Sequence, residues 1–167
     1  MCAAVGVATG IVGGIAGLLT PVVLATAPFL YGLVLGSHVL PGIIAQEVLR
    51  RPLVALITHV MAALVASAFN PAWAMRFIGT ALLFGGIQEG IAALTRYRAW
   101  GPWRFFISGA IIGVLVAVVV FFAVDLALLP GWAQIVYLAV SVLAPMAWTA
   151  AGLGIGRGLR RAGVARR

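Results

Sequence analysis

Charge is scarce in this sequence. Of its 167 residues 8% are charged and 64% are hydrophobic, whereas a water-soluble domain carries about 25% charged residues. So few polar residues cannot cover a soluble surface, which excludes an ordinary soluble domain and indicates a lipid bilayer as the solvent. The single cysteine, Cys2, leaves no pair for an internal disulfide.

Motifs of known enzyme classes are also missing. The chain has no HExxH, no GxSxG and no phosphate-binding loop, and it contains only three acidic residues. The closely spaced glycines between 152 and 158 follow no strand, so they do not form a phosphate loop. No inverted repeat of the secondary transporters is evident. We therefore expect neither an enzyme nor a pump that hydrolyses ATP by itself.

Long apolar runs fill the chain instead. A bilayer span needs about 20 mainly apolar residues, and these runs predict an all-α membrane protein with six transmembrane helices in one domain, residues 1–167. The expected spans are residues 3–19, 28–49, 53–69, 74–95, 103–128 and 132–154, with a basic tail at 157–167. Because the run 111–122 does not alternate with period two, an outer-membrane barrel is excluded.

All eleven basic residues are arginine, and they stand at the ends of the predicted helices. With six spans, ten fall on one side of the membrane: Arg50, Arg51, Arg96, Arg98, Arg104, Arg157, Arg160, Arg161, Arg166 and Arg167. The other side holds Arg76 alone. Since cytoplasmic loops are enriched in Arg and Lys, we expect a multi-pass cell-membrane protein with both termini in the cytoplasm. The net charge of +8 thus reflects topology, and nucleic acid is not an expected partner.

Glu89 is an acid inside an apolar span. A carboxylate near a bilayer centre is unfavourable by roughly 2.5–3.5 kcal/mol, so it usually faces a cavity or a partner. His59 lies about two helical turns past Pro52, and Glu89 about two turns before Arg96, so both are about 10 Å inside the same ends of antiparallel neighbours. They could form an ion pair or a charge-assisted hydrogen bond. This pair is either purely structural or part of a ligand cavity.

Four further side chains are candidates for lining a ligand pocket: His38, Gln88, Phe84 and Tyr31. A bis-histidine haem needs ligands at similar depth, and His38 and His59 differ by roughly 8 Å. A metal site built from His59, Glu89 and Gln88 has no spacing signature and a weak ligand set. We therefore expect no haem, metal or other cofactor.

Small residues form a seam along the first predicted span. Its members recur at helical spacing and are Ala3, Gly6, Gly10, Gly13 and Gly17. Such seams let helix backbones approach closely in membranes. Two interpretations stay open: packing inside the bundle, or docking of another membrane protein.

Three stretches suggest a family. They are Leu49-Arg50-Arg51-Pro52, then 62–66 (AALVA), then Glu89 followed by Tyr97-Arg98-Ala99-Trp100. Together they resemble the YkoE-type substrate-binding subunits, or S components, of energy-coupling factor (ECF) vitamin transporters. In that family an acid stands eight residues before a YRxW sequence, the spacing that Glu89 and Tyr97 have here.

The resemblance implies a function. An S component captures a small vitamin, here thiamine or its hydroxymethylpyrimidine precursor, in a pocket that opens outward. It then delivers the vitamin through a membrane coupling subunit driven by two ATPases, and the small-residue seam would dock on that subunit. On this interpretation Glu89 accepts a cationic or amine-bearing ligand, with His59 as its partner.

Two alternatives remain at this stage. Several presumed pocket positions depart from the family pattern, among them His38, His59 and Phe84, and Leu53 replaces a glycine. The first alternative is thus another small vitamin-like or metal ligand on the same scaffold. The second is a membrane interaction or assembly protein whose glycine-rich first helix is its working surface.

Overall fold

The computed structural model describes residues 1–123 and 125–164, and this part of the chain is helical without any strand. Its elements are α1 (Cys2–Thr26), η1 (Pro28–Leu30), α2 (Tyr31–Gly36), η2 (Ser37–Val39), α3 (Leu40–Leu49), α4 (Val54–Phe69), η3 (Pro71–Trp73), α5 (Ala74–Leu94), α6 (Pro102–Ala123), η4 (Leu126–Leu128) and α7 (Gly131–Arg161). Five segments are long and apolar enough to cross a bilayer, and α4 is a shorter apolar helix. The all-α prediction is confirmed.

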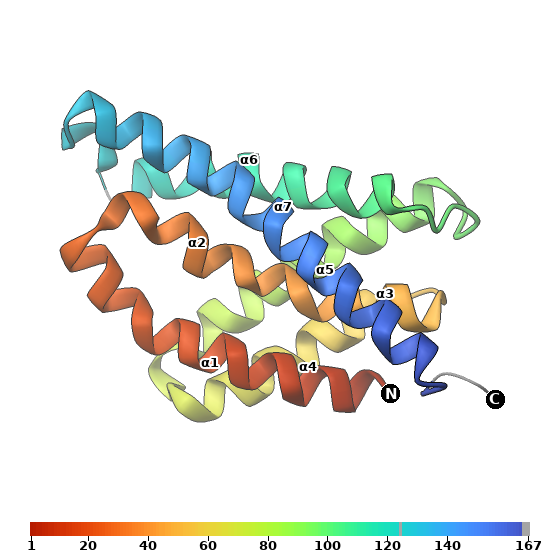
Figure 1. Cartoon of the computed structure of the whole chain (residues 1–167). Coiled ribbons are helices and arrows are strands. Elements are labelled where there is room, and N and C mark those ends of the chain that lie inside the picture. The colour runs from red at the N-terminus through yellow and green to blue at the C-terminus, as the bar shows by residue number, and fades with distance from the viewer. Residues whose placement is uncertain (124, 165–167) are drawn as a thin grey trace.

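The helices form a bundle with the ends of the polypeptide near each other. Figure 1 shows α6 along one side and α1 and α4 along the opposite side, with the α2–α3 segment between them and α7 crossing the bundle from the α6 side toward Met1. Met1 and the C-terminal end of α7 lie at the same end of the bundle (Figure 1). The α3–α4 and α5–α6 connections, which carry Arg50, Arg51, Arg96 and Arg98, follow the helix ends that face this way.

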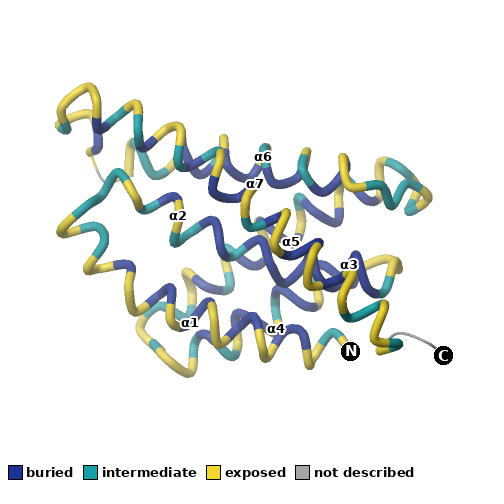
Figure 2. Tube along the Cα trace, in the orientation of Figure 1, coloured by how far each residue is buried: buried dark blue, intermediate teal, exposed yellow. Residues whose placement is uncertain are grey.

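Burial follows the inner faces of the helices (Figure 2). The main core cluster contains Val39, Ile43, Phe84, Phe105, Ile112, Val116 and Leu153. Large apolar side chains such as Leu94 and Phe122 are instead 84% and 75% exposed. In water this surface would be unfavourable by about 25 cal/mol per Å², so the outside of the bundle is suited to lipid.

The second span is built of short helical pieces. Pro28 begins η1 and Pro41 stands in the first turn of α3, where a missing N–H costs nothing. Glycines at 32 and 36 let this segment approach α7, because a Cβ at Gly32 would lie 2.6 Å from the Ser141 Cα and one at Gly36 would lie 3.0 Å from the Pro145 nitrogen. The bend brings η2 into the middle of the bundle.

Three predicted helix ends were wrong. α1 continues through Pro21 to Thr26 instead of ending at residue 19, since the apolar run continues and the proline costs one hydrogen bond that a bilayer helix tolerates. α6 ends at Ala123 and not at residue 128, because Asp125 adopts a left-handed conformation with φ 50°. α7 runs past residue 154 to Arg161.

Contacts with α3 explain the length of α7. A Cβ at Gly152 would lie 3.0 Å from the Ile43 side chain, and one at Gly156 would lie 2.8 Å from that of Glu47. Arg160 then forms an ion pair with Glu47 at 3.0 Å, and the Glu47 side chain is 4% exposed. Close packing and this ion pair keep the glycine-rich segment helical.

The seam of small residues packs inside the chain. Gly6, Gly10, Gly13 and Gly17 are buried, and a Cβ at Gly10 would lie 2.7 Å from the Ala62 carbonyl oxygen on α4. Only Ala3, among the five residues predicted to dock a partner, is exposed. The prediction that the four glycines form a docking face for a partner is therefore wrong, because α4 and α5 already pack against them.

Candidate ligand-binding site

A cavity of about 480 Å³ lies at the end of the bundle opposite the arginine-rich ends. It is lined by Gly17, Thr20 and Leu24 of α1; Tyr31, Leu35 and His38 of the second span; Trp73 of η3; Arg76, Phe77, Gly79, Thr80, Leu83 and Phe84 of α5; and Leu115, Val116, Val119, Val120 and Ala123 of α6. These are late residues of α1 and α6 and early residues of α2 and α5. Pockets for small molecules are usually 300–1,000 Å³.

Local sequence shapes the cavity wall. A Cβ at Gly17 would lie 2.6 Å from the Phe77 ring, so glycine lets this ring rest against α1. The His38 and Phe77 rings are stacked, with an interplanar angle of 10° and centroids 6.3 Å apart. His38 of η2 and Phe77 in the first turn of α5 thus form one flat wall of the cavity.

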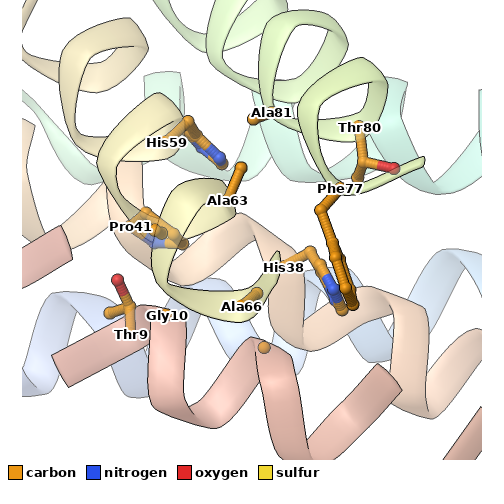
Figure 3. Close-up of a pocket in the computed structure, with 12 residues that line it drawn as sticks. Thr9, Gly10, His38, Pro41, His59, Ala63, Ala66, Phe77, Thr80 and Ala81 are labelled. Carbon is orange, nitrogen blue, oxygen red and sulfur yellow. The ribbon is translucent and has the colours of Figure 1, made fainter. Parts of the chain in front are cut away.

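A smaller cavity of about 20 Å³ adjoins the large one (Figure 3). His38, Phe77 and Thr80 line both, and His59 reaches the smaller cavity from α4. A space of this size holds about one water molecule. The pair of rings formed by His38 and Phe77 therefore belongs to the wall between the two spaces.

Three of the six predicted ligand-binding residues line the large cavity: Tyr31, His38 and Phe84. His59 lines only the small cavity, and Gln88 and Glu89 line neither. Gln88 lies between two buried groups, with Oε1 3.1 Å from His59 Nε2 and Nε2 donating to the Val39 carbonyl at 3.0 Å. This bridge ties α5 to α4 and η2.

The expected contact between His59 and Glu89 is replaced by the one between His59 and Gln88. Glu89 Oε2 accepts the Ala55 N–H at 3.1 Å and the Gln46 amide at 3.2 Å, and Oε1 accepts the Leu53 N–H at 2.5 Å. Gln88 and Glu89 are neighbours on α5, so their side chains point about 100° apart around the helix. The carboxylate is thus drawn to the positive end of α4.

Tyr97 lies beside this carboxylate in the connection after α5. Burial first, and then the negative charge of Glu89, raise the pKa of Tyr97. Glu89 and Tyr97, which stand eight residues apart in the sequence, therefore lie together at the arginine-rich end, away from the large cavity.

The electrostatics of the large cavity favour ligands without positive charge. Among the residues that the structure describes, Arg76 is the one charged side chain that lines it, and no carboxylate does. The same residues contain no group of three His, Cys, Asp or Glu side chains placed to hold a metal ion. Aromatic rings, two threonines and one histidine can instead hold a flat molecule with a polar edge.

Several lining residues were missed by sequence reasoning. Trp73, Phe77 and Thr80 were not among the predicted pocket residues. Arg76 did carry a distinguishing signal, because the predicted topology leaves it as the single arginine on its side of the membrane.

Comparisons with known proteins agree with this fold. A family model described as "ABC-type cobalt transport system, permease component" matches residues 1–115. A solved structure entitled "Crystal structure of an S-component of ECF transporter" is similar with a TM-score of 0.84 at 18% identity, over 98% of this chain and 84% of the other. A search of curated proteins finds no match.

Proposed function

Since the chain belongs to the family of ABC-type cobalt transport system permease components, we propose that it is the substrate-binding membrane subunit of an ECF-type importer. The observation that carries this proposal is the cavity of about 480 Å³ among α1, α2, α5 and α6, in a chain with the fold of an ECF S component. The arginine distribution supports cytoplasmic termini. The cavity then faces outward and takes its ligand from outside the cell.

The cargo that fits this cavity is organic. The family description names cobalt, but Co²⁺ in proteins is bound by several imidazole, carboxylate or thiolate groups. The lining of the large cavity offers one imidazole, that of His38, beside a guanidinium. Free Co²⁺ would therefore meet one ligand and a repulsive charge.

The resemblance to vitamin S components gives the first organic candidates. Thiamine carries a positive thiazolium ring, which Arg76 disfavours, whereas its hydroxymethylpyrimidine precursor is uncharged. The precursor's flat ring suits the aromatic walls made by Trp73, Phe77 and Phe84. We therefore place a pyrimidine-like ring ahead of thiamine.

The partners in this proposal are a membrane coupling subunit and two ATPases, which supply the energy of transport. Because the four glycines of the α1 seam are buried, the coupling subunit binds elsewhere on the lipid-facing surface. This chain then contributes ligand capture and no hydrolytic step.

Ligand-dependent thermal unfolding of the purified protein tests the proposal. A ligand stabilises the folded state by RT ln(1 + [L]/Kd). We expect hydroxymethylpyrimidine to raise the unfolding temperature, thiamine to raise it less, and Co²⁺ or a chelator to leave it unchanged. Stabilisation by Co²⁺ alone would instead support a metal importer.

Co-expression with a coupling subunit and an ATPase pair tests the assembly. The proposed function predicts a stable complex of all components after purification. A chain that binds no small molecule and no ATPase module would favour the interaction or assembly protein considered above.

A further inference from the structure

We infer that Arg76 binds an acidic group of the cavity's ligand, so that the cargo is a flat heteroaromatic ring carrying a carboxylate or a phosphate. This inference rests on the proposed function and extends it to the charge of the ligand. It starts from the distribution of arginine: among the described residues, eight arginines stand toward the opposite end of the bundle and Arg76 is the exception.

The position of Arg76 opposes the general trend. Arginine is disfavoured on the outer side of a membrane protein, yet this one lines the cavity and is exposed at its mouth. Its guanidinium lies over the Trp73 ring, 5.0 Å from the centroid. Within residues 1–123 and 125–164, no Asp or Glu forms an ion pair with it.

The three acidic residues of the chain either bind other groups or lie outside the described lining of the cavity. Glu47 pairs with Arg160, and Glu89 accepts the N–H groups of Leu53 and Ala55. Asp125 precedes η4 and is not in the described lining of the cavity. An anionic ligand would supply the missing countercharge, and a guanidinium binds carboxylate or phosphate through two parallel hydrogen bonds.

The inner part of the cavity accommodates the ring of such a ligand. The Nδ1 atom of His38 is buried and has no hydrogen-bond partner among the described residues. Phe77 stacks on the same imidazole, and Phe84 lines the cavity as well. A flat ring resting against these aromatic walls, with an acidic substituent at the mouth beside Arg76, would complement the cavity.

Ligands that share a ring and differ in charge provide the test. The first set shares one pyrimidine: hydroxymethylpyrimidine (neutral), its monophosphate (anionic) and thiamine (cationic). The second set is nicotinate and nicotinamide, a carboxylate and its neutral amide. Dissociation constants are measured by calorimetry on the purified full chain, for wild type, Arg76→Gln, Arg76→Lys and Arg51→Gln. Arg51 is an exposed arginine at the opposite end and serves as the control.

We expect the acid of at least one set to bind about tenfold more tightly than its neutral partner, the effect of a charge-assisted hydrogen bond. Arg76→Gln should remove this preference, so that acid and neutral partner bind this variant with equal affinity. Arg76→Lys should retain part of it, and Arg51→Gln should retain all of it.

Three results would overturn the inference: equal binding of acid and neutral partner, a preference that survives in Arg76→Gln, or binding of no acid at all. These failures are distinguishable from failure of the proposed function. Binding of a neutral ring, or assembly with the coupling subunit and ATPases, would leave the S-component proposal intact.

Discussion

The carboxylate of Glu89 on α5 accepts the backbone N–H of Ala55 in the first turn of α4, at 3.1 Å. A second oxygen accepts the Leu53 N–H. The first N–H groups of a helix have no partner within the helix, and in a bilayer each unpaired group costs several kcal/mol. One buried acid thus caps the helix that α1 and α5 both pack against.

Replacement of Glu89 by glutamine should lower stability more than it lowers ligand affinity. The amide loses one acceptor oxygen and directs a donor at other donors, which costs about 1–3 kcal/mol. Chemical denaturation measures the stability change, and calorimetry with hydroxymethylpyrimidine measures affinity. A loss of affinity at unchanged stability would restore Glu89 as a ligand-binding residue.

Substitution of Leu53 by glycine should stabilise the protein. Leu53 precedes α4 with φ 64°, in the left-handed region, and its side chain is solvent- or lipid-exposed. This conformation costs a non-glycine residue about 1–2 kcal/mol, and glycine adopts it freely at some cost in chain entropy. We expect a net gain of about 0.5–1 kcal/mol in denaturation experiments. Leu53→Ala, which keeps the strain, is the control and should give no gain.

Substitution of Gly10 by alanine should separate α1 from α4. The added Cβ would lie 2.7 Å from both the Ala62 oxygen and the Val65 Cβ, and overpacking of this kind costs about 1–3 kcal/mol. Gly86→Ala on α5 is the matched control, because nothing lies within 4 Å of its Cβ position. Thermal unfolding should show a loss for the first variant and none for the second.

His59 and Gln88 should be energetically coupled. Their side chains meet at 3.1 Å, and both are buried. Contacting residues show interaction energies of about 0.5–3 kcal/mol in double-mutant cycles. We expect a coupling in this range from His59→Ala, Gln88→Ala and the double variant. A parallel cycle of His59 with Glu89 should give a coupling energy near zero. A larger coupling for His59 with Glu89 than for His59 with Gln88 would instead support the pair expected from the sequence.

Hydropathy and the placement of arginine were sufficient to predict the helical bundle, because both depend on the solvent and not on tertiary contacts. The ends of helices were predicted less well. Pro21 is an ordinary stop signal in water, yet the helix continues through it, and the turn at Asp125 depends on a left-handed residue that has no glycine to mark it. These outcomes are set by packing and by the bilayer.

The candidate site was predicted in part for a similar reason. Tyr31, His38 and Phe84 line the cavity as expected of pocket residues, since polar or aromatic groups in the outer halves of spans have few other places to face. The depth of Glu89 estimated from helix rise stays a prediction. Its partner was not predictable, because the α4 N-terminus reaches it only through the backbone of Arg50 and Leu53, which both have positive φ.

Three residues, His38, Phe77 and Thr80, line both cavities. A smaller side chain at Phe77 would thin the wall between them and extend the room toward His59. The side chains shared by the two cavities would then decide how long a ligand the site accepts. Affinities of homologous ligands of increasing length, measured for Phe77→Leu and wild type, would show whether the variant accepts longer ligands.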